Sequence, residues 1–379
     1  MILIAETHAA RAAQLVPLLA ARAADHDRDA SFPFKAIALF REAGLLALTV
    51  PRAYGGAEAD LSTVCAVLEE IGRGDASAGL VLAMQLTWFA TLNRGAWPPS
   101  LVERLNRAAV EDGALINALR VEPELGTPAR GGLPATTVER VPGGWLLNGH
   151  KIYATGSPAL SYYAVWARTT GEQPRVGYII VPRDVAGVRI VETWNHIGMR
   201  ASGSHDVIFE NVFIPDEFIA DMRPPAAWNA RDPFSAAWGS LPIAALYTGI
   251  ARAARDWLVG YLNERTPANL GAPLATLPRF QIAVGEIETL LQINHALIAQ
   301  NLAELERDQA AGGRAALVKS VATNNTIRAV DIALGLVGNP GLSRHHPLER
   351  YHRDALCGRV HTPQDDTVMQ GLGRAALGV

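Results

Sequence analysis

The residues best suited to proton chemistry lie close together near the C-terminus. His361 is followed four and five residues later by Asp365 and Asp366, in the segment His361-Thr362-Pro363-Gln364-Asp365-Asp366. An imidazole titrates near neutrality, so it can give or take a proton at physiological pH. Adjacent carboxyl groups can raise the pKa of one of the pair, although such a pair at the start of a helix is also a common cap. The segment therefore supplies candidate acids and bases.

The sequence lacks several motifs that mark other kinds of active site. His345, His346 and His352 also lie near the C-terminus, but neither a His-Glu-x-x-His pattern nor acidic residues at ligand spacing accompany them. We therefore expect no metal site. There is no glycine-rich dinucleotide fingerprint, no P-loop and no Gly-x-Ser-x-Gly elbow. A Rossmann dehydrogenase, an NTPase and a serine hydrolase are thus unsupported.

The composition favours small-molecule ligands over nucleic acid or membrane. The 379-residue chain is 49% apolar and 19% charged, with a formal net charge of −3, so it carries no basic field for polyanions. Cys65 and Cys357 form neither a disulfide framework nor a metal-ligand spacing, which suits a reducing compartment. We see no signal-peptide pattern and no apolar run of the ~20 residues that a membrane span needs. We expect a cytoplasmic protein.

A β-rich stretch at residues 142–215 divides two helical parts of the chain. Gly143-Gly144 and Asn148-Gly149 are two-residue hairpin signals, because Gly and Asn tolerate the positive φ that strand-matched turns need. Segments rich in β-branched and aromatic residues predict further strands at 163–168, 177–181 and 206–214. An antiparallel β-domain is expected here.

Apolar residues recur at helical spacing on both sides of this stretch. Asp75 can cap a helix from Ala76 to about Leu92, and long apolar stripes after residue 233 predict a C-terminal four-helix bundle. We expect an α+β multidomain chain with an N-terminal helical domain, a central antiparallel β-domain and a helical bundle, at residues 1–112, 113–222 and 233–379. The broad stripes also predict a homo-oligomer, a dimer or a tetramer.

Four stretches resemble the acyl-CoA dehydrogenase superfamily of flavoproteins. The most specific is Ile197-Gly198-Met199-Arg200-Ala201-Ser202, followed by Phe209-Glu210-Asn211-Val212-Phe213-Ile214-Pro215, which is similar to the family pattern "LGMRxS…F.NV.VP". The other stretches are residues 50–56 with 68–72, residues 145–155 and residues 338–354. The likeness covers nearly the whole chain, so the sequence predicts a member of this superfamily.

The resemblance implies a flavoprotein oxidoreductase that binds FAD between the β-domain and the bundle. By position, Tyr153 places an aromatic ring and Thr155 a hydroxyl against the flavin ring. Arg265 falls where the family places an Arg on the flavin phosphates, often those of the neighbouring subunit. These residue types suit the task, because hydroxyl donors stabilise an anionic reduced flavin and Arg binds phosphate in a bidentate geometry.

The chain departs from the family's dehydrogenases at the catalytic base. Those enzymes take an α-proton from an acyl thioester with a glutamate nine residues after the position of Arg353, and Thr362 stands there. Another position used by some members lies within residues 239–249, which contain no carboxylate. A three-residue insertion would put Asp365 at the base position, beside Asp366. The first hypothesis is therefore oxidation of an acyl-CoA-like substrate by Asp365 or Asp366 and bound flavin, with an electron-transfer partner.

A second branch of the superfamily fits the same segment. Its monooxygenases take reduced FMN from a separate flavin reductase and use O2, and some carry His-Thr-x-x-Asp where dehydrogenases carry the glutamate. This chain has that pattern at residues 361–365, so His361 would donate a hydrogen bond or a proton near the flavin. A family Gln that contacts the adenosine part of FAD aligns with Gly335, and FMN is the alternative cofactor. A third hypothesis is a scaffold that kept the fold and lost catalysis.

Overall fold

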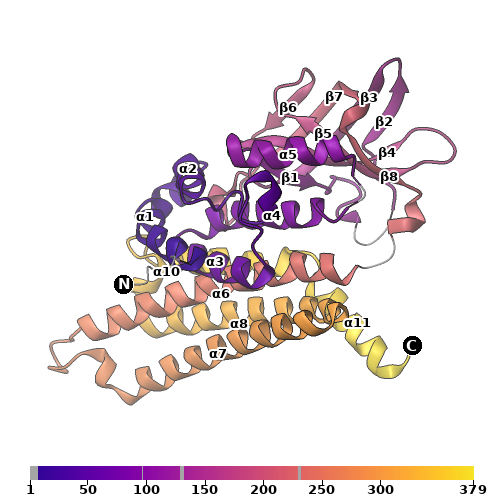
Figure 1. Cartoon of the computed structure of the whole chain (residues 1–379). Helices are drawn as coiled ribbons and strands as arrows, with labels where there is room; N and C mark the ends of the chain where they lie inside the picture. The colour runs from indigo at the N-terminus through magenta and orange to yellow at the C-terminus, as the bar shows by residue number, and fades with distance from the viewer. Residues whose placement is uncertain (1–6, 96, 129–131, 229–231) are drawn as a thin grey trace, which may run out of the picture.

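Helices, then a sheet, then helices follow one another along the chain, as the sequence predicts (Figure 1). The computed structural model describes residues 7–95, 97–128, 132–228 and 232–379. The N-terminal helices and the sheet lie beside each other, and the long C-terminal helices extend beneath both. The expected order of helical domain, β-domain and helical C-terminal region is confirmed.

The N-terminal region is a layer of helices built around one apolar helix. Its helices are α1 (His8–Asp29), α2 (Phe34–Glu42), α3 (Leu61–Gly74), α4 (Ala76–Leu92) and α5 (Pro99–Glu111). The side chain of Asp75 accepts a hydrogen bond from the Ala78 amide at the start of α4, so the predicted cap is confirmed. Most of α4 is buried, because apolar residues occupy all its sides rather than one stripe.

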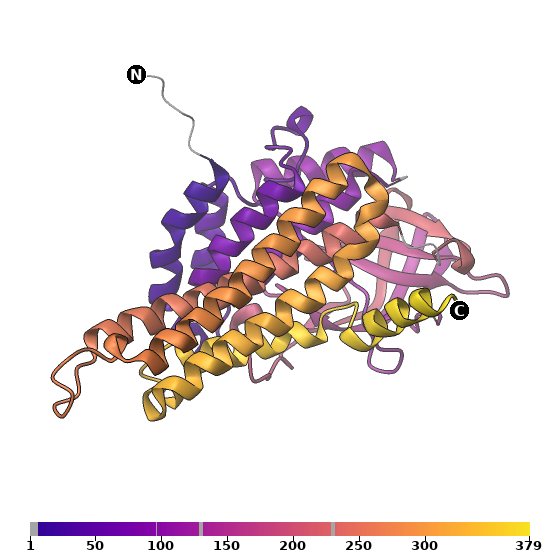
Figure 2. The ribbon, with the colours of Figure 1, turned by 90° about the horizontal axis from the view of Figure 1, so that it is seen from below.

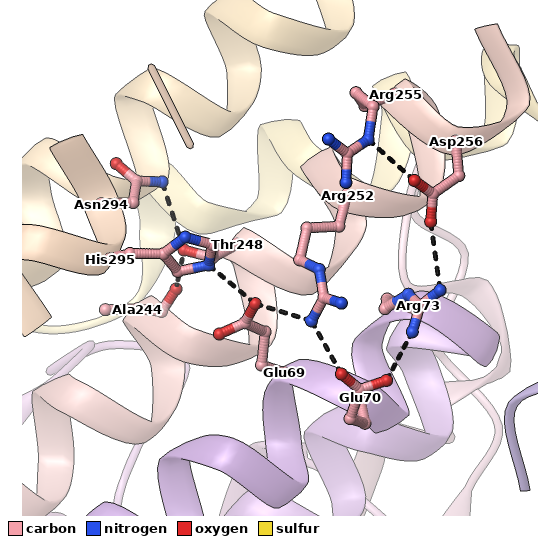
Figure 3. A network of polar contacts seen from close by, with 10 residues as sticks. All are labelled: Glu69, Glu70, Arg73, Ala244, Thr248, Arg252, Arg255, Asp256, Asn294 and His295. Carbon is pink, nitrogen blue, oxygen red and sulfur yellow. Dashed lines mark hydrogen bonds and ion pairs between the residues drawn. The ribbon is translucent and has the colours of Figure 1, made fainter. Parts of the chain in front are cut away.

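A polar network joins the N-terminal helices to the longest C-terminal helix (Figure 3). The Arg252 guanidinium on α6 (Pro233–Glu264) donates to Glu69 and to Glu70 on α3, each at 2.8 Å. His295 on α7 (Pro278–Arg307) also bonds Glu69, at 2.8 Å. Because these groups are half-buried and share partners, the network fixes how α3 lies along α6.

The middle of the chain forms one eight-stranded sheet in the order β6-β7-β3-β2-β4-β5-β8, with β1 paired to β4. Its strands are β1 (Leu115–Leu119), β2 (Thr137–Val141), β3 (Gly144–Ala154), β4 (Leu160–Thr169), β5 (Val176–Pro182), β6 (Val188–Val191), β7 (His205–Pro215) and β8 (Ile219–Arg223). The sheet is mainly antiparallel, but β1 and β2 pair with β4 in parallel. The β2–β3 hairpin and the turn after it form the long connection that such pairs require.

The two predicted hairpin turns have different outcomes. A turn through Gly143, with φ of +79°, joins β2 to β3 as predicted. The second prediction is wrong, because Asn148 and Gly149 lie inside β3 at a shift of its register with β7. There the Asn148 side chain accepts from the Asn211 amide. A Cβ on Gly149 would stand 2.4 Å from the Thr136 side chain, so this glycine serves close packing rather than a turn.

The C-terminal region consists of long helices that run side by side (Figure 2). They are α6, α7 and α8 (Ala315–Val337), with the shorter α9 (Asn339–Leu342), α10 (Leu348–Leu356) and α11 (Asp365–Leu377). The helix α10 packs against both α6 and α8, so four helices share one bundle. Within the described ranges, we find no helix with the length and apolarity to cross a membrane.

Candidate functional site

An exposed aromatic platform lies at the end of β3. The Tyr153 ring is 53% exposed, and its backbone adopts a φ of +58°, which is uncommon for a large side chain. The ring stands edge-on to Trp194 and His196, with centroids 6.3 and 5.9 Å away. Trp194 and His196 stack on each other at 3.7 Å. The platform, defined as Tyr153, Trp194 and His196, therefore offers aromatic surface that the chain itself does not cover.

A row of hydroxyl groups begins two residues after Tyr153. The Thr155 and Ser204 hydroxyls lie 2.9 Å apart, and the Ser204 and Ser202 hydroxyls lie 2.8 Å apart. Ser202 and Ser204 are buried, whereas Thr155 is half-buried. The Thr155 carbonyl accepts from the Asn117 side chain at 3.0 Å, which fixes this end of β3. The two predicted flavin contacts, Tyr153 and Thr155, thus lie together where β3 ends, and their contact with a flavin stays a prediction.

The helix α10 anchors the platform to the helical bundle. The Asp354 carboxylate accepts from the Met199 amide at 2.6 Å, and the Met199 carbonyl accepts from the Trp194 indole at 2.9 Å. Burial raises the pKa of Asp354 to about 7. Arg353 donates to Asp27 on α1 and to the Ile197 carbonyl. Arg353 and Asp354 therefore position the platform from the bundle side.

His361 lies between α6 and α8. Its Nε2 is 2.9 Å from the Tyr247 hydroxyl on α6. Lys319 on α8 donates to the His361 carbonyl at 2.7 Å and to the Pro363 carbonyl at 2.9 Å. Burial, followed by the Lys319 charge, lowers the pKa of His361 to about 4. The imidazole therefore stays neutral down to about pH 4, whereas a freely titrating histidine becomes protonated below about pH 6.5.

The two candidate carboxylates begin α11. Asp365 accepts from the Ser320 hydroxyl at 2.7 Å and from the Asn324 amide at 2.6 Å, both on α8. Asp366 accepts from the Thr367 backbone at 2.7 Å and is exposed. Asp365 thus docks the start of α11 on α8, and among the described residues neither carboxylate makes a capping hydrogen bond at the start of α11. The role of either residue as a base stays a prediction.

Arg265 lies apart from the other predicted site residues. It follows α6 in the loop to α7, at the end of the long helices that points away from the sheet (Figure 1). One chain therefore does not bring Arg265 to Tyr153 and Thr155. Its predicted contact with a flavin phosphate would have to be made in a neighbouring subunit, and it stays a prediction.

Sequence reasoning missed Tyr247 and Lys319. Tyr247 lies within residues 239–249, where some family members carry the catalytic base, and it is fully buried. Lys319 is fully buried in α8, a helix rich in apolar residues. A single lysine within an apolar stripe was the available signal, because a buried charge needs partners. In the described part of the chain no group of three or more His, Cys, Asp or Glu could hold a metal ion.

Comparison with known families agrees with this architecture. Models of the acyl-CoA dehydrogenase N-terminal, middle and C-terminal domains match residues 7–96, 120–212 and 241–365. The putative acyl-CoA dehydrogenase YdbM of Bacillus subtilis is 33% identical over 359 residues, which cover 94% of this chain and 92% of that protein. The chain belongs to the acyl-CoA dehydrogenase family.

Relatives within the family carry names of two kinds. Besides YdbM, L-evernosamine nitrososynthase of a Micromonospora species is 30% identical over 93% of this chain and 85% of its own length. A solved structure of KijD3 with FMN and an amino-keto sugar nucleotide superposes with a TM-score of 0.85 at 29% identity, covering 98% of this chain and 93% of that one. This acyl-CoA dehydrogenase family member is thus similar both to a named dehydrogenase and to nitrososynthases.

Proposed function

We propose that this family member is the oxygenase component of a two-component flavin-dependent monooxygenase, which takes reduced FMN from a separate reductase and uses O2. The observation that carries the proposal is the neutral His361, bonded to Tyr247 at 2.9 Å. By resemblance, its neighbour Thr362 occupies the place of the dehydrogenase glutamate. A neutral imidazole with one N–H can donate a hydrogen bond to a reduced oxygen species, whereas a dehydrogenase needs a carboxylate base.

The platform fits a flavin. An isoalloxazine ring needs an aromatic surface on one face and hydrogen-bond donors near its carbonyl oxygens. Tyr153 supplies the exposed surface, and the Thr155 hydroxyl stands at the end of the Ser202–Ser204 row. These residues would hold the ring, and Arg265 of a neighbouring subunit would hold the phosphate. The KijD3 complex, which contains FMN, supports FMN as the flavin.

The proposed reaction balances with O2 and a reduced flavin. Bound reduced flavin supplies the two electrons and two protons that this reaction consumes. One oxygen atom then enters the substrate and the other leaves as water, while the flavin leaves oxidised. The contribution of the chain is to keep water from the ring with Tyr153 and to hold a hydrogen-bond donor at His361. The relatives named nitrososynthases support an oxygenase, and the substrate class stays open.

A second candidate is oxidation of an acyl thioester, which the 33% identity to the putative acyl-CoA dehydrogenase YdbM favours. In that case Asp365 or Asp366 would take the α-proton, and an electron-transfer partner would reoxidise the flavin. The hydrogen bonds of Asp365 to Ser320 and Asn324 weigh against this role, because each of its carboxylate oxygens already accepts from a side chain of α8.

Flavin identity and redox preference test the proposal. The protein is purified, any released flavin is identified and counted, and oxidised and reduced FMN are then titrated anaerobically. We expect little retained flavin and tighter binding of reduced FMN than of oxidised FMN. Near-stoichiometric FAD that acyl-CoA substrates bleach without oxygen would overturn the oxygenase and support the dehydrogenase. Failure to bind either flavin in either redox state would leave the scaffold hypothesis.

A further inference from the structure

We propose that Tyr247 and Lys319 are positioning residues that hold His361 in one tautomer. In this tautomer Nδ1 carries the proton and Nε2 carries none. The inference deepens the proposed function, because it states which ring nitrogen faces a ligand and that this nitrogen donates. The tautomer rests on the contacts of the His361 ring, the two carbonyls that accept from Lys319, and the burial of Tyr247 and Lys319. None of these observations depends on the reaction.

The Tyr247 hydroxyl decides where the imidazole proton lies. Tyr247 is fully buried, and His361 Nε2 is its hydrogen-bond partner at 2.9 Å. Burial raises the pKa of Tyr247 well above its usual value, so the phenol keeps its proton. Were Nε2 protonated, the phenol O–H would have no acceptor among the described residues, which costs about 1–3 kcal/mol. The phenol therefore donates to Nε2, and the neutral ring carries its proton on Nδ1.

Lys319 fixes the backbone and opposes a second proton on the ring. It is fully buried, and its ammonium donates to the carbonyls of His361 and Pro363 rather than to a carboxylate. The nearby Asp365 carboxylate is bonded instead to Ser320 and Asn324. The lysine charge is therefore not neutralised by direct contact, and it acts on the imidazole across a short, water-poor distance.

The consequence is a directed hydrogen-bond donor. Among the described residues we see a hydrogen bond to Nε2 only, and we infer that Nδ1 is the ring nitrogen that faces a ligand. A fixed Nδ1–H recognises an acceptor atom, such as a reduced oxygen species or a carbonyl, and it does not act as a base. This excludes the imidazole as the group that takes a proton from a substrate carbon.

The tautomer can be read by nitrogen NMR without flavin or substrate. Protein labelled with 15N-histidine is compared with His361→Gln to assign the His361 signals. We expect a pyrrole-type signal for Nδ1 and a pyridine-type signal for Nε2. In Tyr247→Phe the ratio of the two tautomers should change about tenfold toward Nε2–H, because one hydrogen bond is lost. A protonated Nε2 in the unmodified protein would overturn the inference.

Tyr163→Phe is the matched control. The Tyr163 hydroxyl is also buried, but it has no hydrogen-bond partner among the residues that the structure describes. Its removal should leave the His361 signals unchanged. If Tyr163→Phe moved them as much as Tyr247→Phe does, the effect would be one of general packing and the assignment to Tyr247 would fail.

Lys319 is tested by titrating the same signals. The titratable or charged groups around this segment are Tyr247 on α6, Lys319 on α8, Asp354 and Cys357 before it and Asp365 after it. Lys319→Met should raise the pKa of His361, whereas Lys319→Arg keeps the charge and should leave that pKa low. An unchanged titration in Lys319→Met would overturn the role of Lys319. If Lys319→Met does not fold, Lys319→Arg provides the test. A raised His361 pKa in that variant would overturn the role of the Lys319 charge.

The outcomes separate this inference from the proposed function. If reduced FMN does not bind but the signals show Nδ1–H, the tautomer stands and the oxygenase falls. If reduced FMN binds and reacts with O2 but the signals show Nε2–H, the oxygenase stands and the inference falls.

Discussion

Lys151 and Lys319 are both fully buried, but different groups accept their hydrogen bonds. In the sheet, Lys151 donates to the Glu122 carboxylate at 2.6 Å, and Glu122 also accepts from the Thr136 amide and hydroxyl. In the bundle, Lys319 donates to two backbone carbonyls next to His361. The first charge is cancelled by a direct partner, and the second is not.

This difference gives the two lysines different roles: that of Lys151 is structural, and that of Lys319 is electrostatic. The ion pair of Lys151 ties β3, which ends at Ala154, to the segment that contains Glu122, so it supports the strand that carries Tyr153. The Lys319 charge acts on His361, and it belongs to the part of the site that departs from the dehydrogenase pattern. The candidate flavin contacts thus lie on the β-domain, while His361 and its partners Tyr247 and Lys319 lie in the helical C-terminal region.

The largest expected effect is on stability and tests the two lysines against each other. Lys151→Met leaves the buried Glu122 carboxylate without its cation, so the free energy of unfolding should fall by about 3–5 kcal/mol. Lys319→Met leaves only neutral carbonyls without a donor, and the loss should be about 1–3 kcal/mol. Chemical denaturation of both variants measures the difference. Equal losses would break the comparison.

The pH dependence of stability isolates His361. Its pKa is about 4 in the folded protein and 6.5 in the unfolded chain, so between these values the unfolded chain binds more protons. The stability contributed by this group is complete above pH 6.5, and up to about 3 kcal/mol is lost as pH falls to 4. Asp354, with a pKa raised to about 7, changes stability in the opposite direction over the same range.

His361→Gln therefore serves as the reference for this measurement. Denaturant unfolding of the unmodified protein and of the variant is compared at several pH values between 4.5 and 7. The gap in unfolding free energy should shrink as pH falls. A gap that stays constant would mean that His361 titrates normally, and the neutral imidazole would lose its support.

Flavin affinity tests the platform. Tyr153→Ala should weaken FMN binding about tenfold, because an aromatic contact is worth about 0.5–1.5 kcal/mol beyond buried area. Phe213→Ala is a matched control, since Phe213 lies on the same sheet and is 49% exposed against 53% for Tyr153. Fluorescence titration with FMN reports both. Equal weakening in the control would place the flavin elsewhere.

The smallest expected effect concerns the Thr155 hydroxyl. Thr155→Val removes one hydrogen bond to the flavin and should weaken reduced FMN binding by about 0.5–1.5 kcal/mol. Thr155→Ser keeps the hydroxyl and should bind nearly as the unmodified protein does. If both variants bound equally well, the hydroxyl would not face the flavin.

Local patterns explain how much of the fold was predictable. The cap at Asp75 and the strands around residues 163–168 and 206–214 follow from short-range spacing, and the structure contains them. The turn expected at Asn148-Gly149 fails, since the same residues also suit a register shift where the backbone passes close to Thr136. Only the packing of two distant strands distinguishes these outcomes.

The sequence predicted individual residues of the candidate site but not the contacts between them. His361, Tyr153 and Thr155 could be named from their motifs. Tyr247 and Lys319 could not, because they lie 114 and 42 residues from His361 and sit in helices whose apolar patterns give no reason to pair them with it. Folding brings them together, and with them come the neutral state of the imidazole and its direction.

The most direct test of the account follows the release of H2O2 when protein-bound reduced FMN meets O2 without substrate. The unmodified protein should release H2O2 much more slowly than free reduced FMN does. His361→Ala should release it about tenfold faster than the unmodified protein, because one hydrogen bond to the reduced oxygen species is lost. Asp365→Asn should behave like the unmodified protein. Release as fast as from free FMN, or full retention in His361→Ala, would contradict an oxygenase that depends on His361.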